Sequence, residues 1–168
     1  YSPQDATTFF YAFNYNRKAY NFTAKTTDAQ KNSATAAMLN KDFRQAINFA
    51  FNRKAYGAQQ NGEDGATKIL RNSLVPPTFV QIGEKSFGSA VEGNLASYGD
   101  EWKDVKLDDA QDGLYNADKA KAEFAKAKES LQAQGVEFPI HLDLPVNQTN
   151  NVLVQQANSF KQSVEETL

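Results

Sequence analysis

The sequence predicts an α/β fold that contains more helix than sheet. Three stretches carry apolar residues at helical spacing, and two other stretches have strand-like patterns. These elements follow one another as strand, helix, loop, helix, strand and helix, an order typical of α/β or α+β domains. With 168 residues, the chain is long enough to enclose an apolar core.

The two predicted strands lie near opposite ends of the chain. Residues 7–14 read TTFFYAFN, and their consecutive apolar residues favour a strand that is covered on both faces. Residues 136–144 read VEFPIHLDL, in which apolar residues alternate from Phe138 to Leu144. This alternation predicts a half-buried strand.

Each predicted helix combines an apolar stripe with a capping residue. The first begins near Asn40 or Asp42 and ends near Arg53, where cations suit a helix C-terminus. The second covers residues 117–134, with Asn116 as its cap and Gly135 at its end. The third follows the polar turn at residues 147–151 and buries Val154, Ala157, Phe160 and Val164.

The remaining stretches predict irregular structure. Residues 15–32 are polar and suggest an exposed connection, and a turn-rich stretch with repeated glycines begins at Tyr56 and Gly57. The proline pair at Pro76 and Pro77 stops any helix or central strand. Residues 78–100 are rich in glycine and serine, so we expect a long surface loop there with at most short helical turns.

The composition excludes several classes of function. The net charge is −2, from 18 basic and 20 acidic residues, and no basic stripe indicates a nucleic-acid partner. The absence of cysteine excludes disulfides, thiolate nucleophiles and cysteine-ligated metals. The chain carries neither a signal peptide nor an apolar run of about 18 residues. It begins without Met and ends inside what the pattern predicts to be a helix. We therefore expect it to be part of a longer protein.

No catalytic, metal or cofactor site is predicted. His141, the one histidine, falls out of phase with the apolar strand positions, so we expect it at the surface. The acidic residues between Asp100 and Asp112 fail the spacing of a calcium loop and predict a solvated loop. Phosphate-binding glycine motifs are absent. We expect neither enzymatic activity nor a cofactor.

The aromatic stretch Phe9-Phe10-Tyr11 has two compatible interpretations. It can form a buried central strand, or it can line a binding cleft at the edge or end of a strand. In the second case Tyr11 and Asn14 would offer hydrogen bonds.

Residues 40–53, NKDFRQAINFAFNR, are the most informative motif. They resemble the signature of family 5 of the bacterial extracellular solute-binding proteins, which serve peptide and nickel importers. In that family a segment close to F-x-D-x-R-V-R-Q-A-I-N-Y-A-I-D-R follows a strand ending in Asn, as at Asn14. Three further stretches agree in order with the family: NSLVPP at 72–77, YNADKAK at 115–121, and the strand, polar turn and helix after Phe138. Two departures are Asn52 in place of Asp and a longer linker before Asn40.

The resemblance is strongest to oligopeptide-binding lipoproteins of Gram-positive bacteria, and its implications concern the whole protein. Residues 1–168 would be part of the second large lobe of a type II periplasmic-binding-protein fold, with further sequence at both ends. The parent protein would bind oligopeptides between two lobes and deliver them to the permease subunits of an ABC importer. It would be a monomer, tethered by lipid at the extracellular face of the membrane.

The resemblance also implies contact residues, and its alternatives remain open. The peptide-binding candidates are Phe10, Tyr11, Asn14, Asn147, Gln148 and Asn150. The peptide itself would be held largely through hydrogen bonds to its backbone. One alternative is a surface adhesion or protein-interaction domain without a transport role. A second is an enzyme such as a glycosidase, which would need two converging carboxylates.

Overall fold

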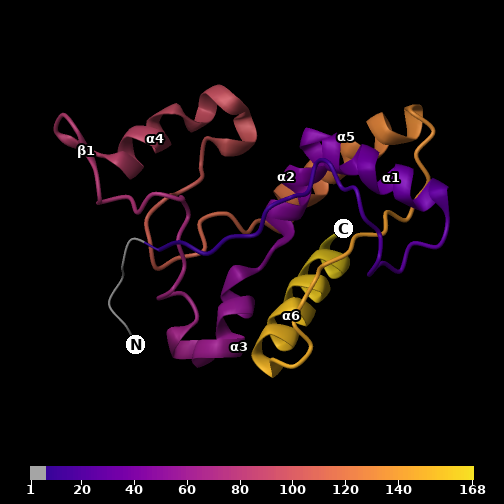
Figure 1. Cartoon of the computed structure of the whole chain (residues 1–168). Coiled ribbons are helices and arrows are strands. Elements are labelled where there is room, and N and C mark those ends of the chain that lie inside the picture. The colour runs from indigo at the N-terminus through magenta and orange to yellow at the C-terminus, as the bar shows by residue number, and fades with distance from the viewer. Residues whose placement is uncertain (1–6) are drawn as a thin grey trace.

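The computed structural model describes residues 7–168, which form helices joined by long extended segments (Figure 1). The helices are α1 (Asp28–Leu39), α2 (Lys41–Ala50), α3 (Arg53–Gly65), α4 (Phe87–Leu95), α5 (Ala117–Ala133) and α6 (Asn151–Thr167), with the 3₁₀ turns η1 (Ala96–Tyr98) and η2 (Asp100–Trp102). The strands β1 (Gln81–Ile82) and β2 (Lys85–Ser86) pair antiparallel as a short hairpin. The helix-rich character predicted from the sequence is therefore confirmed.

Helix α2 lies at the centre because its apolar residues contribute to both core clusters. One cluster places Phe43 and Ile47 against Ala127 and Leu131 of α5. The other surrounds Phe49, which is fully buried. Burial of a large apolar side chain contributes roughly 1.5–3 kcal/mol, so the side chains that α2 buries stabilise its packing against α5.

The three predicted helices are present, with the caps that the sequence indicated. The side chain of Asn40 accepts a hydrogen bond from the backbone N–H of Phe43 at 2.9 Å. The side chain of Asn116 accepts one from Lys119 N–H, also at 2.9 Å. Gly135 follows α5 with φ +77°, the left-handed conformation that favours glycine at a helix end.

Helix α1 corrects the prediction of an exposed connection over residues 15–32. Thr27 and Gln30 form a capping box, in which each side chain accepts a hydrogen bond from the other residue's backbone N–H. The buried residues of this helix are small, namely Ser33, Ala34 and Ala37. A helix that buries only small side chains gives no apolar stripe, which is why the sequence pattern concealed it.

Helices α3 and α4 correct two further expectations. Arg53 starts α3 instead of ending the preceding helix, because the side chain of Asn52 caps the new helix by accepting from Ala55 N–H at 2.9 Å. The stretch 78–100, expected as a long loop, contains the hairpin and α4, which Ser86 caps.

The two predicted strands are wrong for the part of the chain that the structure describes. Residues 7–14 and 136–144 belong to neither β1 nor β2, and the second stretch bends at Phe138 and Pro139. The alternation still operates in the second segment, where Val136, Phe138 and Ile140 pack on the α2–α5 cluster. A strand also requires a hydrogen-bonded neighbour, and side-chain periodicity alone does not supply one.

Candidate functional site

Tyr11 lies in a cluster of four aromatic rings drawn from three parts of the chain. Its ring centroid is 5.9 Å from that of Phe51, 5.8 Å from Tyr56 and 5.6 Å from Phe160. Most of these pairs meet edge to face, the arrangement that the ring quadrupole favours. The Tyr11 hydroxyl donates a hydrogen bond to the Tyr56 hydroxyl at 3.0 Å. We call these four residues the tyrosine cluster.

The tyrosine cluster is open to solvent on one side. Half of Tyr11 remains exposed, as does 67% of the adjacent Phe10. Partial burial, together with the hydrogen bond to Tyr56, raises the pKa of Tyr11 well above its usual range. The Tyr11 hydroxyl therefore stays neutral at physiological pH and can bind a ligand through hydrogen bonds.

Helix α6 fixes the position of this cluster through Ser163. The Ser163 hydroxyl donates to the carbonyl of Ala50 at 2.5 Å and accepts from the backbone N–H of Asn52 at 2.8 Å. These groups belong to the junction between α2 and α3, where helix ends leave backbone polar atoms without helical partners. The bond pair thus fixes Phe51, which lies between Ala50 and Asn52, relative to α6 and Phe160.

The four polar candidates lie at turns and helix ends. Asn14 is exposed, and its side-chain carbonyl accepts from Asn16 N–H at 3.0 Å. Asn147 accepts from the backbone N–H and hydroxyl of Thr149 at 3.0 and 2.8 Å. Gln148 is exposed in the same turn, and Asn150 caps α6. The side-chain amide nitrogens of Asn14, Asn147 and Asn150 are not needed for these bonds.

The structure divides the six candidates into two groups. Phe10, Tyr11 and Asn14 share one extended segment beside the tyrosine cluster. Asn147, Gln148 and Asn150 precede α6, whose Phe160 contacts Tyr11. Ten residues of helix separate Asn150 from Phe160, which corresponds to roughly 15 Å along the axis. The second group therefore lies apart from the tyrosine cluster.

Sequence analysis missed the partners of Tyr11 as site residues. Phe51 and Phe160 were each predicted as part of an apolar helix stripe, and Tyr56 fell in a presumed turn. Only the tertiary arrangement of α3 and α6 brings them together. The available signal was the recurrence of aromatic residues on α2, α3 and α6, which is equally typical of an ordinary core.

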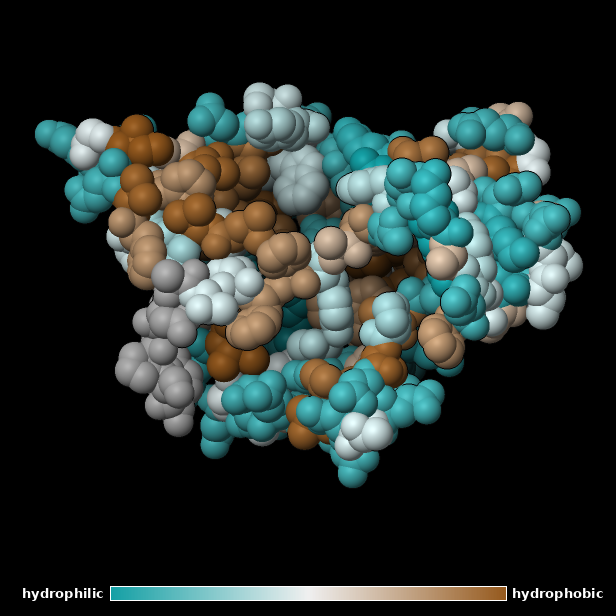
Figure 2. All heavy atoms as spheres, in the orientation of Figure 1, coloured by the Kyte–Doolittle hydropathy of each residue, from teal (hydrophilic) through white to brown (hydrophobic). Residues whose placement is uncertain are grey.

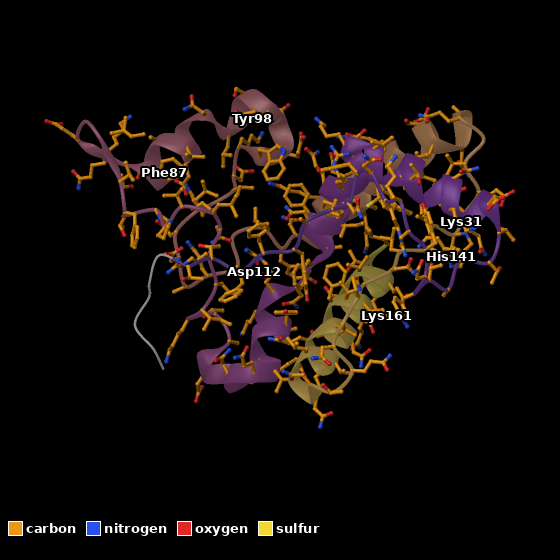
Figure 3. All side chains as sticks on the ribbon, in the orientation of Figure 1. Lys31, Phe87, Tyr98, Asp112, His141 and Lys161 are labelled. Carbon is orange, nitrogen blue, oxygen red and sulfur yellow. The ribbon has the colours of Figure 1, made fainter. Side chains whose placement is uncertain are left out.

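Arg53 organises the loops beside α3. Its guanidinium contacts the Asp112 carboxylate, with Nη2 and Nε at 2.6 and 3.0 Å from Oδ1. It also donates to the Arg71 carbonyl at 2.9 Å and to the Asn72 side chain. Asp112 in turn accepts from the backbone N–H of Arg53 and of Tyr115. Asp112 lies near the middle of the molecule as drawn in Figure 3. Through these contacts, its ion pair with Arg53 connects the start of α3 to the segments at Arg71 and Tyr115.

A second ion-pair cluster surrounds Asp143 in the extended segment before α6. Its Oδ2 accepts from Lys25 Nζ at 2.5 Å, from the Thr23 hydroxyl at 2.7 Å and from Arg17. Lys25 is buried, and its ion pair with Asp143 offsets part of the cost of removing the two groups from water. Burial alone would raise the pKa of Asp143, but the hydrogen bonds from Lys25, Thr23 and Arg17 outweigh it and hold the pKa well below its usual range.

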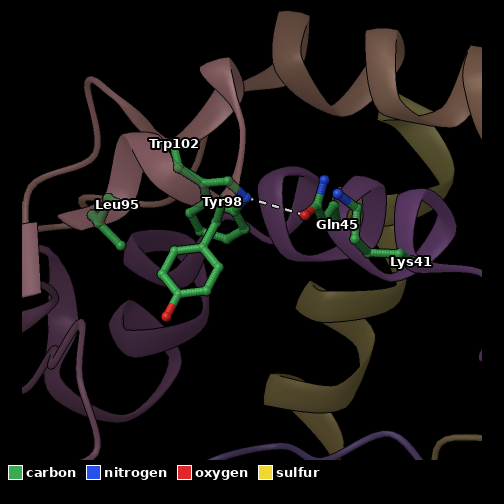
Figure 4. A pocket seen from close by; sticks show the side chains of 5 residues that line it. All are labelled: Lys41, Gln45, Leu95, Tyr98 and Trp102. Carbon is green, nitrogen blue, oxygen red and sulfur yellow. Dashed lines mark hydrogen bonds between the residues drawn. The ribbon is translucent and has the colours of Figure 1, made fainter.

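A pocket of about 260 Å³ lies between α2 and the turns after α4 (Figure 4). Its walls are Lys41, Gln45, Leu95, Tyr98 and Trp102. The Gln45 side chain accepts from Trp102 Nε1 at 3.1 Å. Its amide nitrogen donates to Glu101 at 2.9 Å and to the buried Glu123 at 2.8 Å. The side-chain amide of Gln45 is therefore hydrogen-bonded to three neighbouring side chains and connects α2, α5 and η2.

The other candidates for chemistry give no reacting arrangement. His141 is exposed, as predicted. Within residues 7–168, no group of histidine and carboxylate side chains is arranged to hold a metal ion. Asp109 has one buried carboxylate oxygen without a hydrogen-bond partner, and burial raises its pKa despite the nearby charge of Arg71. Among the described helices, none is both long enough and apolar enough to cross a membrane.

Comparison with known proteins gives the class of protein to which the chain is similar. The chain is similar over its whole length to part of the oligopeptide-binding proteins of streptococci, which confirms the resemblance predicted from residues 40–53. No family model matches the chain.

The particular relatives are named oligopeptide-binding proteins. Oligopeptide-binding protein SarA of Streptococcus gordonii is 62% identical over 168 residues, all of this chain and 25% of that protein. Oligopeptide-binding protein AliA of Streptococcus pneumoniae is 60% identical over the same length, 26% of that protein. Oligopeptide-binding protein AmiA of Streptococcus pneumoniae is 59% identical over 155 residues, 92% of this chain and 24% of that protein. The chain thus spans about a quarter of the length of these relatives.

Proposed function

We propose that the chain is part of an extracellular oligopeptide-binding receptor that delivers peptides to an ABC importer. The observation that carries the proposal is the 54–62% sequence identity, over the whole of this chain, to proteins named for oligopeptide binding. Those proteins are named as binding proteins and not as enzymes, in line with a receptor without catalytic activity. The permease subunits of the importer would be its protein partners, and the receptor would act as a monomer tethered by lipid at the outer face of the membrane.

Within that receptor, residues 1–168 form part of the second large lobe, and the polypeptide continues at both ends. The extended segments at 7–14 and 136–144 support this arrangement. Each has a strand-like sequence, and residues 8–14 and 138–146 make no backbone-to-backbone hydrogen bond to another described residue. Unpaired extended backbone is readily completed by a neighbouring strand. In the longer protein these two segments become strands of the sheet of a type II lobe.

The peptide lies against the tyrosine cluster on the exposed side of Tyr11. There Phe10 supplies apolar surface, and the hydroxyls of Tyr11 and Tyr56 offer polar contacts. Asn14 contributes its side-chain amide, which has free donors. Asn147, Gln148 and Asn150 form a separate contact region at the turn before α6. Recognition that relies mainly on the peptide backbone tolerates many side chains, which suits a receptor for mixed oligopeptides.

Calorimetry on the longer receptor tests the proposal. A mixture of oligopeptides should bind, and Tyr11→Ala should weaken affinity about tenfold, as expected for a tyrosine at the centre of an interface. Asn14→Ala should weaken it less, because one amide contact is lost. Tyr115→Ala is a matched control, since Tyr115 is also partly exposed but lies outside the cluster.

The 168-residue chain alone should bind the same mixture far more weakly, because half of the cleft is missing. Micromolar binding by this chain alone would contradict the two-lobe site. Unchanged affinity of the Tyr11→Ala receptor would show that the tyrosine cluster only supports the fold.

A further inference from the structure

One face of the chain carries an exposed apolar surface that the tyrosine cluster does not include. Brown, apolar spheres gather there, over the region of β1 and α4 (Figure 2). Its members come mainly from the segment that leads into the hairpin, and they are 38–63% exposed. We define the docking face by Leu74, Val75, Phe79, Val80 and Ile82.

The N-terminal segment extends this face. The Thr8 hydroxyl donates to the carbonyl of Leu74 at 3.0 Å, so the two segments lie side by side. Phe9, the next residue, is 93% exposed. A bulky aromatic side chain that buries almost nothing has no stabilising role within residues 7–168, which indicates that its contact lies elsewhere.

The docking face also lacks charge. Residues 72–82 contain no Asp, Glu, Lys or Arg, although charged residues make up 23% of the chain. The solvated face of α5, by contrast, carries Lys121 and Lys128. Depletion of charge with enrichment of large apolar side chains is typical of the centre of an interface. An isolated soluble domain rarely leaves such a surface uncovered.

We infer that the docking face is covered by another segment of the same polypeptide, outside residues 1–168. The inference rests on the proposed function insofar as the receptor is longer than this chain. The length of the relatives indicates what covers the docking face, because they are about four times as long as the stretch they share with this chain. In a polypeptide of that size, an uncharged apolar face finds its cover intramolecularly, because the covering segment is present at a high effective concentration.

Single cysteines provide the test, because the chain contains none. Phe79→Cys and Ile82→Cys place a thiol on the docking face, and Lys121→Cys places one on the exposed side of α5 as a control. The rate of maleimide labelling is measured in the 168-residue chain and in the complete gene product, each normalised to the unfolded protein. Circular dichroism verifies that each variant is folded.

We expect labelling of both docking-face cysteines to be about tenfold slower in the complete gene product than in the chain, because burial blocks access to the thiol. The Lys121→Cys control should differ by less than about twofold. Equal rates at both lengths would overturn the inference. Slower labelling of the isolated chain at higher protein concentration would also overturn it, because it would assign the face to a second copy. Slower labelling only after peptide is added would overturn it as well. Labelling does not depend on peptide binding, so failure of the proposed function would leave this result readable.

Discussion

Replacement of Arg53 by Met should cause the largest loss of stability of any single change considered for this fold. Methionine keeps the apolar stem of the side chain but removes the guanidinium. The side chains of Arg53 and Asp112 are only 14% and 11% exposed, so water replaces the lost contacts poorly. The carbonyl of Arg71 and the side-chain oxygen of Asn72 each lose the hydrogen bond from Arg53, although Asn72 keeps one from Gly113 N–H.

The size of the effect follows from this environment. Removal of one partner from a largely buried ion pair costs about 3–5 kcal/mol, because the other charge remains desolvated. Asp112 keeps its backbone donors at Arg53 and Tyr115, which favours the lower half of this range. Arg53→Lys should cost less, about 1–3 kcal/mol, because the charge is kept while the forked geometry is lost.

Urea unfolding followed by circular dichroism at 222 nm measures these differences. With a slope of roughly 2 kcal/mol per molar urea, Arg53→Met should lower the midpoint by about 1.5–2 M. Lys161→Ala is the control, because Lys161 and Glu165 form a largely exposed pair, and its effect should stay within about 0.5 kcal/mol. If Arg53→Met changed stability no more than this control, the Arg53 contacts would not hold the loops in place.

Substitutions at three further positions test other parts of the fold. The pKa of Asp143 is lowered in the folded chain, so its contribution to folding stability is present above the unfolded pKa of about 3.9 and is lost as the pH falls towards the folded pKa. The urea midpoint of Asp143→Asn should therefore fall less steeply below about pH 4 than that of the native chain. Parallel pH profiles of the two midpoints would refute the linkage. Gly57→Ala should lower the melting temperature although alanine favours helix, because its Cβ would lie 2.3 Å from the carbonyl oxygen of Ala66; an unchanged or higher value would show that this contact relaxes freely. Asn116→Ala should cost about 1 kcal/mol in urea unfolding through loss of the α5 cap, and Asn116→Asp should restore most of it.

The helices that the sequence predicted are those whose large apolar residues meet the core. Phe43 and Ile47 of α2 and Leu131 of α5 create a stripe that the sequence displays directly. The motif over residues 40–53 predicts one helix with a cationic end, and this pattern conceals the start of helix α3. Asn52 divides the motif by capping α3, and Asp at that position in the family pattern would cap equally well. This departure from the pattern therefore preserves the local structure.

The candidate site was predicted only in part. Tyr11 was nominated because aromatic residues in an extended segment suggest a cleft, and the structure places it in a half-exposed cluster. Its neighbours Phe51, Tyr56 and Phe160 come from helices whose packing depends on long-range contacts, which no local pattern encodes. The strands at both ends failed for a related reason, since pairing depends on a partner that is distant in sequence or lies outside residues 7–168.

The α2–α5 interface has a consequence for the order of folding during synthesis. Roughly 70 residues separate the end of α2 from the start of α5, so the apolar face of α2 leaves the ribosome long before its partner exists. Phe49 has the same difficulty, because the 2.8 Å bond from Asn116 N–H to its carbonyl closes the same long loop. The nascent chain therefore exposes its most amphipathic described helix for several seconds at ordinary elongation rates, and this interval is when a chaperone or an export factor can bind it.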